Sequence, residues 1–264
     1  MAAVIECVPN FSEGRSRKVV DAIVHSIRSV PGTKVLDVEM DPDHNRSVVT
    51  FTGGREAVRE SAFRAARTAM ELIDLTKHKG EHPRMGALDV MPFVPISGAT
   101  MKDCVDIANK VGERIGRQLK IPVYLYEAAA RRPDRKNLET VRKGQFEGLR
   151  EAITSDDSRY PDFGPRAVHP TAGAVAVGAR MPLIAFNVNL RSEDLEVAKA
   201  IAKKIRASSG GLPHVKALGF HLAERRMVQV SMNPRTTPSP RSPRCSSRSS
   251  RRPRRGAWRW PRAR

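Results

Sequence analysis

The 264-residue sequence has few cysteines and no long apolar run, and each of these absences excludes a class of protein. Cys7, Cys104 and Cys245 lie far apart and form no C-x-x-C pair. This spacing argues against a disulfide framework or a thiolate metal site and fits a reducing cytoplasm. No apolar stretch reaches the length of about eighteen residues that a membrane span needs, so we expect no transmembrane helix. The N-terminus has no basic region before Glu6, so we expect a first strand there rather than a signal peptide.

Acidic residues are missing from residues 235–264, and this distorts the net charge of +19. The segment holds eleven arginines and no lysine, so residues 1–234 carry 36 basic and 28 acidic side chains. A mildly basic body of this kind suits an anionic small substrate. The segment itself is rich in Arg, Ser and Pro and has no apolar periodicity, so we expect it to be disordered.

Hydrophobic spacing predicts alternating strands and helices up to residue 126. The predicted strands are 4–8, 33–38, 47–52, 89–95 and 123–126, and the predicted helices are 16–29, 56–73 and 102–119. The prolines in 89–95 favour an edge strand or a strand end, and the composition of residues 128–170 predicts an irregular segment. This order predicts an α+β fold with a mixed sheet covered by helices.

A second unit is predicted to begin near Ala179. Its pattern is a strand over 182–190, a helix over 193–207 with Ser192 as its N-cap, and a hairpin of 215–221 and 227–232. This β-α-β-β order repeats that of residues 4–52, so a duplication is plausible. A split β-α-β-β-α-β module needs one more helix and strand. Residues 235–264 have no pattern for them, so we expect the second unit to be incomplete.

The loop of residues 77–86 concentrates ionisable side chains just before a predicted strand. It holds two histidines, two lysines, one arginine and one glutamate, the groups that proton transfer and anion binding require. His78 and His82 have the spacing of a helical zinc pair, but Gly80 and Pro83 oppose a helix, and we expect no metal site. Spacing alone favours a solvated basic loop over a catalytic one.

Two further segments carry groups that can bind ligands. Asp37 and Glu39 share one face of a strand because the side-chain period is two, and paired carboxylates can hold a cationic group. The pattern alone favours solvated acids in a hairpin. In residues 162–174, glycines and small residues allow a ligand close to the backbone, and Arg166 and His169 can meet an anion. An interdomain linker is the simpler interpretation of that segment.

Seven short runs together resemble the formiminotransferase family. The longest is His78-Lys79-Gly80-Glu81-His82-Pro83-Arg84-Met85-Gly86-Ala87-Leu88-Asp89-Val90, and the others lie at 6–14, 36–38 with 45–46, 122–126, 161–165, 183–187 and 229–233. The resemblance covers about residues 4–234. It implies two ferredoxin-like subdomains with mixed sheets covered by helices, over residues 1–178 and 179–234, with folate in a groove between them. Residues 235–264 would form a disordered tail.

The resemblance also implies an activity and roles for several residues. The family transfers a formimidoyl group from N-formimidoyl-L-glutamate to N5 of tetrahydrofolate in histidine degradation and one-carbon metabolism, with tetrahydrofolate as co-substrate and no metal. His82 maps onto the family's acid–base group. Asp37 or Glu39 would orient the cationic formimidoyl group, although the family often has Asp in place of Glu39. Lys77, Lys79, Arg84 and Arg166 are candidates for binding carboxylates. The folate-binding segment maps onto Phe163, Gly164, Pro165, Arg166, Ala167, Val168, His169, Pro170, Thr171 and Ala172.

The family pattern breaks near residue 238, where the acid-free composition is typical of a G+C-rich gene read out of frame. We therefore expect a frameshift or a misplaced stop, and doubtful activity if the second subdomain is truncated. An inactive folate-binding fragment and a formylglutamate-dependent transferase are alternatives. Nucleic-acid binding through the tail arginines with Trp258 and Trp260 is a weaker one, because the body lacks an RRM, KH or helix-turn-helix signature. The expected setting is cytoplasmic, with small-molecule substrates, no membrane and a possible homodimer.

Overall fold

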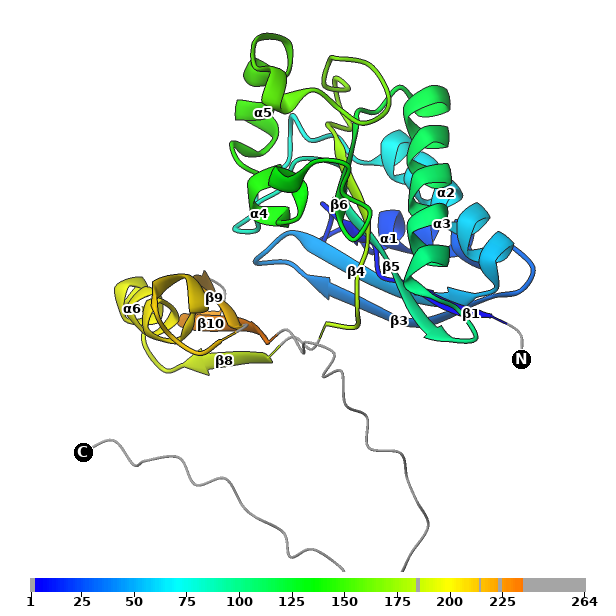
Figure 1. The fold of residues 1–264 in the computed structure, drawn as a ribbon. Helices are drawn as coiled ribbons and strands as arrows, with labels where there is room; N and C mark the ends of the chain where they lie inside the picture. The colour runs from blue at the N-terminus through cyan, green and yellow to red at the C-terminus, as the bar shows by residue number, and fades with distance from the viewer. Residues whose placement is uncertain (1–2, 184–185, 214, 223–224, 235–264) are drawn as a thin grey trace, which may run out of the picture.

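The computed structural model describes residues 3–183, 186–213, 215–222 and 225–234. Residues 235–264, for which we expect disorder and a frameshift, lie outside the described residues. The described residues form two sheets, each covered by helices (Figure 1). Among them, no helix combines the length and the apolar character needed to cross a membrane.

The first sheet is built on the split β-α-β-β-α-β order of a ferredoxin-like module. Its antiparallel part runs β3–β4–β1/β2–β5, where β1 and β2 are successive segments that both pair with β4 and β5. The elements are β1 (Val4–Cys7), β2 (Asn10–Phe11), α1 (Arg17–Arg28), β3 (Thr33–Asp41), β4 (Arg46–Gly53), α2 (Arg55–Leu72) and β5 (Leu88–Ser97).

Two parallel strands extend this sheet beyond β5. After β5 the chain forms α3 (Met101–Arg114) and a π-helical turn (Ile115–Leu119), and then β6 (Val123–Glu127). The next strand, β7 (Val175–Ala179), inserts between β5 and β6 and runs parallel to both. The sheet is therefore mixed, as predicted.

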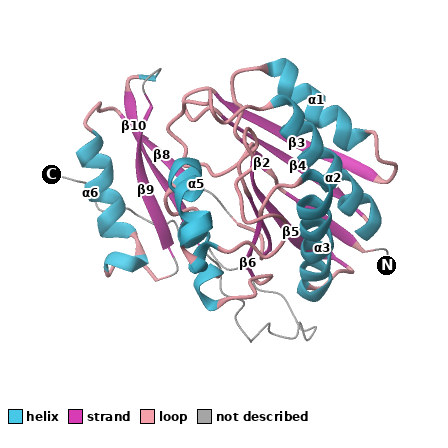
Figure 2. Cartoon of the chain, turned by 90° about the horizontal axis from the view of Figure 1, so that it is seen from above, coloured by secondary structure: helices cyan, strands magenta, loops and turns pink. Residues whose placement is uncertain are grey.

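Helices cover the two faces of the first sheet unequally (Figure 2). α1, α2 and α3 pack on one face, where Ser16 caps α1 and a buried stripe of Val20, Ile23, Val24 and Ile27 meets the core. On the other face α4 (Leu138–Val141) and α5 (Gln145–Ser155) cover only β5, β7 and β6. The same face over β3 and β4 carries Asp37, Glu39 and Arg46.

The structure corrects three expectations for this region. β5 lies inside the sheet, between β1/β2 and β7, and not at its edge; Pro92 still takes part in the sheet because its carbonyl accepts the Val8 N–H at 3.3 Å. Residues 128–170 are not irregular, since they contain α4 and α5. The strand β7 was not predicted, because its run of Val, Ala and Gly is only 5 residues long.

The second sheet contains β8 (Phe186–Leu190), β10 (Met227–Pro234) and β9 (Val215–Leu222), in that order and all antiparallel. α6 (Leu195–Ile205) packs on one face and buries Ala198 and Ala202 against Val228 and Val230. The opposite face is turned toward the first subdomain (Figure 2). The N-cap of α6 is Asp194, whose carboxylate accepts the Glu196 N–H at 2.9 Å, so the prediction of Ser192 was wrong.

The predicted α+β class with ferredoxin-like order is confirmed. Within the described residues the second unit shows the β-α-β-β part of the module, β8, α6, β9 and β10. The division of the chain at residues 178 and 179 stays a prediction.

Candidate functional site

Three backbone segments meet at the turn between β3 and β4. Asn45 ends this turn in a left-handed conformation, with φ of 45°, which asparagine tolerates better than most residues. Its side-chain oxygen accepts the Gly14 N–H and its side-chain amide donates to the Lys79 carbonyl, both at 2.9 Å. Its main-chain carbonyl lies 2.9 Å from Nε2 of His78. Asn45 therefore holds residues 77–86, called here the His82 loop, against the turn.

Gly80 allows the His82 loop to lie directly on this turn. A Cβ atom at position 80 would stand 2.5 Å from the carbonyl oxygen of His44 and 2.7 Å from Cβ of Asn45. Both distances are shorter than van der Waals contact, so any side chain there would push the loop away. Gly80, which the sequence showed only as an obstacle to a helix, is needed here for close packing.

His78 supports the loop through both of its ring nitrogens. Arg84 donates from Nε to Nδ1 of His78 at 3.2 Å, so Nε2 carries the proton and donates to the Asn45 carbonyl. Burial is the main cause of the lowered pKa of His78. Because both ring nitrogens are occupied, His78 holds the loop in place and is not available as a ligand or a proton carrier.

His82 lies partly buried among positive charges. Burial lowers its pKa most, and the charges of Arg46, Arg142, His44 and His78 lower it further, to about 2. The ring of His44 stands 6.5 Å from that of His82, edge to face, with an interplanar angle of 65°. We call His44, Arg46, His78, His82 and Arg142 the His82 cluster. The imidazole of His82 is neutral at ordinary pH in this environment.

His44 is fixed by the turn itself and by the second subdomain. The carboxylate of Asp41 accepts the His44 N–H at 3.0 Å and lies 2.9 Å from its Nδ1. On its other side the ring of His44 meets that of Phe220 on β9, with centroids 5.2 Å apart. The His82 cluster therefore lies at the junction of the two subdomains.

Asp37 and Glu39 project from β3 on the same face as Arg46. They pair across the ladder with Thr50 and Val48 on β4, and both are exposed. The charge of Glu39 is close enough to raise the pKa of Arg46, against the larger lowering by burial. The two acids predicted from the sequence thus share a surface with the His82 cluster.

Arg84 and Arg166, two predicted binders of carboxylates, already have partners within the chain. Arg84 makes two hydrogen bonds to the carboxylate of Glu147, at 2.8 Å and 2.7 Å. Arg166 donates to the Ile153 carbonyl at 2.9 Å and to the carboxylate of Asp157 at 2.8 Å. Both guanidinium groups hold α5 and the turn that follows it against the rest of the subdomain.

The structure divides the predicted folate-binding segment into two parts. Its first part lies on the α3 side, in a cavity of about 410 Å³ lined by Glu113, Gly116, Arg117, Lys120, Phe163, Gly164 and Pro165. Its last part lies beside the chain just before and just after the His82 loop, where the carbonyls of Thr171 and Ala172 accept the N–H groups of Leu75 (2.8 Å) and Ala87 (2.9 Å).

His169 shapes this second part. Its Nδ1 accepts the Ala172 N–H at 3.0 Å, and its backbone exchanges two hydrogen bonds with Gly173, both at 3.0 Å. Burial lowers the pKa of His169. The residues between the two parts, Ala167, Val168 and Pro170, are exposed or partly buried. The segment thus connects the α3 side of the sheet to the chain just before and just after the His82 loop.

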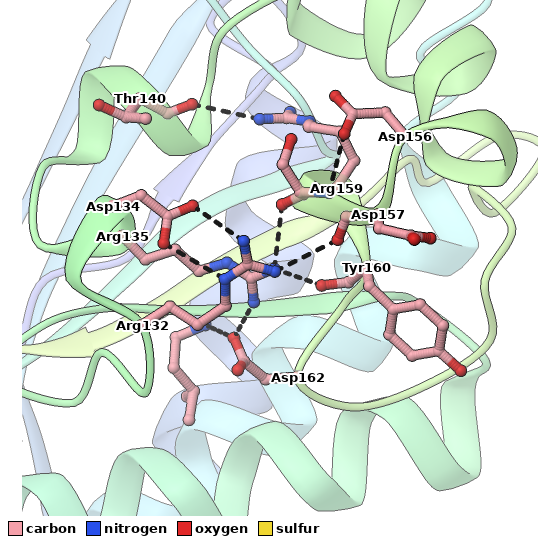
Figure 3. A network of polar contacts seen from close by, with 11 residues as sticks. Arg132, Asp134, Arg135, Thr140, Asp156, Asp157, Arg159, Tyr160 and Asp162 are labelled. Carbon is pink, nitrogen blue, oxygen red and sulfur yellow. Dashed lines mark hydrogen bonds and ion pairs between the residues drawn. The ribbon is translucent and has the colours of Figure 1, made fainter.

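A network of polar contacts that includes three arginines anchors the segment where it begins (Figure 3). The guanidinium of Arg135 pairs with the carboxylate of Asp162 at 2.6 Å, and both side chains are about 5% exposed or less. Asp162 also accepts the Leu125 N–H at 2.7 Å, which ties it to β6. Arg159 donates to the carbonyls of Thr140, Val141 and Lys143 at 2.9–3.2 Å and so holds the end of α4.

Two members of the cluster, Arg46 and Arg142, were not predicted to belong to a site with His82. The signals for Arg46 in the sequence were a run that matches the family and the charged segment that begins at Asp37. Arg142 lay in a region interpreted as irregular, and nothing in its neighbourhood of the sequence marks it. Only the packing of α4 over β5 brings it to His82.

Comparisons with known proteins agree with this architecture. Residues 4–180 match the family model described as "Formiminotransferase domain, N-terminal subdomain", and residues 185–238 match "Formiminotransferase domain". The chain is 53% identical over 233 residues to "Glutamate formimidoyltransferase" of Streptococcus pyogenes serotype M1, covering 88% of this chain and 78% of that protein. The corresponding protein of Thermoplasma acidophilum is 51% identical, with 88% and 76% covered.

A longer relative shares the same region. "Formimidoyltransferase-cyclodeaminase" of Mus musculus is 47% identical over 239 residues, which cover 88% of this chain and 44% of the mouse protein. The family models together span most of the described residues, and the identities to the two prokaryotic relatives exceed half. The chain therefore belongs to the formiminotransferase family.

Proposed function

We propose that this chain transfers the formimidoyl group of N-formimidoyl-L-glutamate to N5 of tetrahydrofolate, with His82 as the acid–base group. The products are 5-formimidoyltetrahydrofolate and glutamate. The observation that carries the proposal is the placement of an imidazole among fixed charges at the subdomain junction, in a chain that is 53% and 51% identical over 233 residues to two glutamate formimidoyltransferases.

The chemistry needs one proton moved from one nitrogen to another. N5 of the folate attacks the formimidoyl carbon and forms a tetrahedral intermediate. The C–N bond to glutamate then breaks as N5 loses its proton and the departing glutamate nitrogen gains one. An imidazole can accept the first proton and donate it to the second nitrogen, and a base positioned in this way contributes on the order of 10²–10⁴-fold to the rate.

The surrounding residues support binding of both substrates. The formimidoyl group is cationic near neutral pH, and the exposed carboxylates of Asp37 and Glu39 lie on the face that carries Arg46. Thr171 and Ala172, from the predicted folate segment, hydrogen-bond to the chain just before and just after the His82 loop. In this proposal Arg84 and Arg166 act by positioning α5, because their guanidinium groups are already paired.

Tetrahydrofolate is a co-substrate in this proposal. Cys7 and Cys104 are free and buried, which fits a reducing cytoplasm, where we place the reaction. A homodimer stays a prediction.

The test measures tetrahydrofolate-dependent consumption of formimidoylglutamate by the full chain, with the folate product quantified by mass spectrometry. We expect His82→Ala to lower the rate at least about 100-fold. His25→Ala is the matched control, because His25 is exposed in the last turn of α1 and lies outside the cluster. Circular dichroism verifies that both variants fold. Equal rates for wild type and His82→Ala would remove His82 from the mechanism.

A further inference from the structure

Arg142 is held in a fixed position at the end of α4. Its backbone N–H donates to the Leu138 carbonyl at 2.9 Å, and Arg159 binds the carbonyls on either side of it. One of its terminal nitrogens pairs with the carboxylate of Asp89. Asp89 is 1% exposed, and its other oxygen accepts the Met85 N–H at 2.8 Å. The guanidinium is therefore anchored on one side only.

The Nε–H group of Arg142 is buried and finds no acceptor among the described residues. Buried donors without an acceptor are rare in folded proteins, because each one costs the full desolvation of a polar group. An arginine presents its donors as a planar fork that fits a carboxylate. The open Nε–H thus points to an acceptor beyond the residues that the structure describes.

Arg46 brings a second guanidinium to the same place. Its Nε donates to the neutral side-chain oxygen of Asn10 at 2.9 Å. Burial and then the charge of Arg142 lower the pKa of Arg46, so the two cations are close enough to repel each other. The lowering of the pKa of Arg46 is offset only in part by the negative charges of Asp89, Glu39 and Asp41. Two partly buried like charges are unfavourable unless an anion lies between them.

We propose that Arg46 and Arg142 form the subsite for the α-carboxylate of N-formimidoyl-L-glutamate, beside His82. The inference rests on the proposed function, since it names the part of that substrate which the cluster binds. The α-carboxylate is attached to the same carbon as the formimidoylated nitrogen. A subsite next to the proton carrier therefore places the nitrogen that must be protonated within reach of His82.

Binding of this carboxylate would also prepare His82 for its role. The charged and titratable groups that face the ring are Arg46 on β4, Arg142 after α4, His44 in the turn and His78 in the same loop. Burial first, and then these groups, keep the pKa of His82 low. A carboxylate between the two guanidinium groups offsets their charge and raises the pKa toward neutrality. His82 would thus carry a proton efficiently only when the substrate is bound.

The experiment compares two probes, L-glutamate and 4-aminobutyrate, which lacks the α-carboxylate. Their binding to the full chain is measured by calorimetry, for wild type, Arg142→Gln, Arg46→Gln and the control Arg114→Gln. Arg114 pairs with Glu60 on the helical face, away from His82. We expect each cluster variant to weaken glutamate about 10- to 100-fold, as loss of a charged hydrogen bond does, and to leave 4-aminobutyrate unchanged. Arg114→Gln should bind both probes as wild type does.

The outcomes separate the subsite from the activity. Loss of glutamate binding in the variants of a protein without turnover would reject the proposed function and keep the subsite. Normal glutamate binding by Arg142→Gln and Arg46→Gln in an active enzyme would overturn the subsite alone. A raised KM for tetrahydrofolate, with an unchanged KM for formimidoylglutamate, would also overturn it, because the folate carboxylates would then be the ligand.

Removal of Arg142 leaves the buried Asp89 without its cation and can prevent folding. Arg142→Lys keeps the charge but lacks the Nε–H, so the subsite predicts a glutamate affinity between those of wild type and Arg46→Gln. The chemical shift of His82 in an NMR titration provides a second measurement on the wild type. Saturating glutamate should raise the pKa of His82, whereas 4-aminobutyrate should not, and equal shifts for both probes would contradict the proposal.

Discussion

The substitution Gly80→Ala tests the packing that positions His82. The added Cβ would lie 2.5 Å from the His44 carbonyl oxygen and 2.7 Å from Cβ of Asn45. Ordinary contacts of a carbon with these atoms are about 3.3–4.0 Å, so the His82 loop must move away from the turn by about 1 Å. The oxygen belongs to backbone that Asn45 holds in place, and it has little freedom to move.

The movement has two separate costs. Overpacking of this kind destabilises a protein by about 1–3 kcal/mol. A displacement of about 1 Å in a catalytic group can lower the rate on the order of 10²-fold even where the protein stays folded. We therefore expect Gly80→Ala to reduce turnover far more than its loss of stability explains.

Gly148→Ala is the matched control. Gly148 lies within α5, and an added Cβ there meets nothing within 4 Å. Alanine is the better helix former, so this substitution should stabilise the protein by about 0.5–1 kcal/mol and leave the activity at the wild-type level. The same chemical change thus has opposite expected effects at two glycines.

Urea denaturation and the formimidoylglutamate assay distinguish these cases. Gly80→Ala should lower the midpoint and the rate, and Gly148→Ala should raise the midpoint alone. A Gly80→Ala protein with wild-type stability and turnover would refute the close packing of the loop on the turn. Loss of stability without loss of rate would show that the loop moves without carrying His82 away.

Two further predictions concern the buried charges. The pKa of His82 is lowered from 6.5 to about 2 in the folded state. Below pH 6.5 the unfolded state therefore binds a proton that the folded state does not. The free energy of unfolding thus decreases as the pH is lowered, by up to about 1.4 kcal/mol per pH unit. His82→Gln should flatten this slope between pH 6 and 4 in urea titrations, and parallel profiles would contradict it. Arg135→Met leaves the buried carboxylate of Asp162 unpaired, which should destabilise the protein by about 3–5 kcal/mol; thermal melting with Arg132→Met as control measures it, since the Arg132–Asp134 pair is exposed.

The elements that the sequence predicts well are those whose pattern is local. The helix α1 follows from a stripe of Val and Ile at helical spacing and from Ser16 as its cap. The hairpin of β3 and β4 follows from β-branched runs on either side of a polar turn. In both cases neighbours within a few residues decide the conformation, so no knowledge of the rest of the fold is required.

Other elements depend on partners that are distant in the chain. A proline is excluded from an inner strand only where its missing N–H is needed, and which N–H groups are needed depends on the register with β1 and β7. α5 buries only Phe146, Leu149 and Ile153 among charged residues, with Gly148 in its interior. Its stripe becomes recognisable only when β6 and β7 provide a surface for it to cover.

The candidate site shows the same division. Similarity to a family placed His82 at its centre, because a long run of identical residues is a local property. Burial and the charge of Arg46 lower its proton affinity most, and a further part comes from Arg142, far along the chain and after a helix of 4 residues. Asp89 on β5 and Arg159 beyond α5 fix that arginine. A sequence can therefore name the group that moves the proton, but the pKa at which it does so is a property of the assembled fold, because electrostatic interactions act through space between residues that no spacing rule connects.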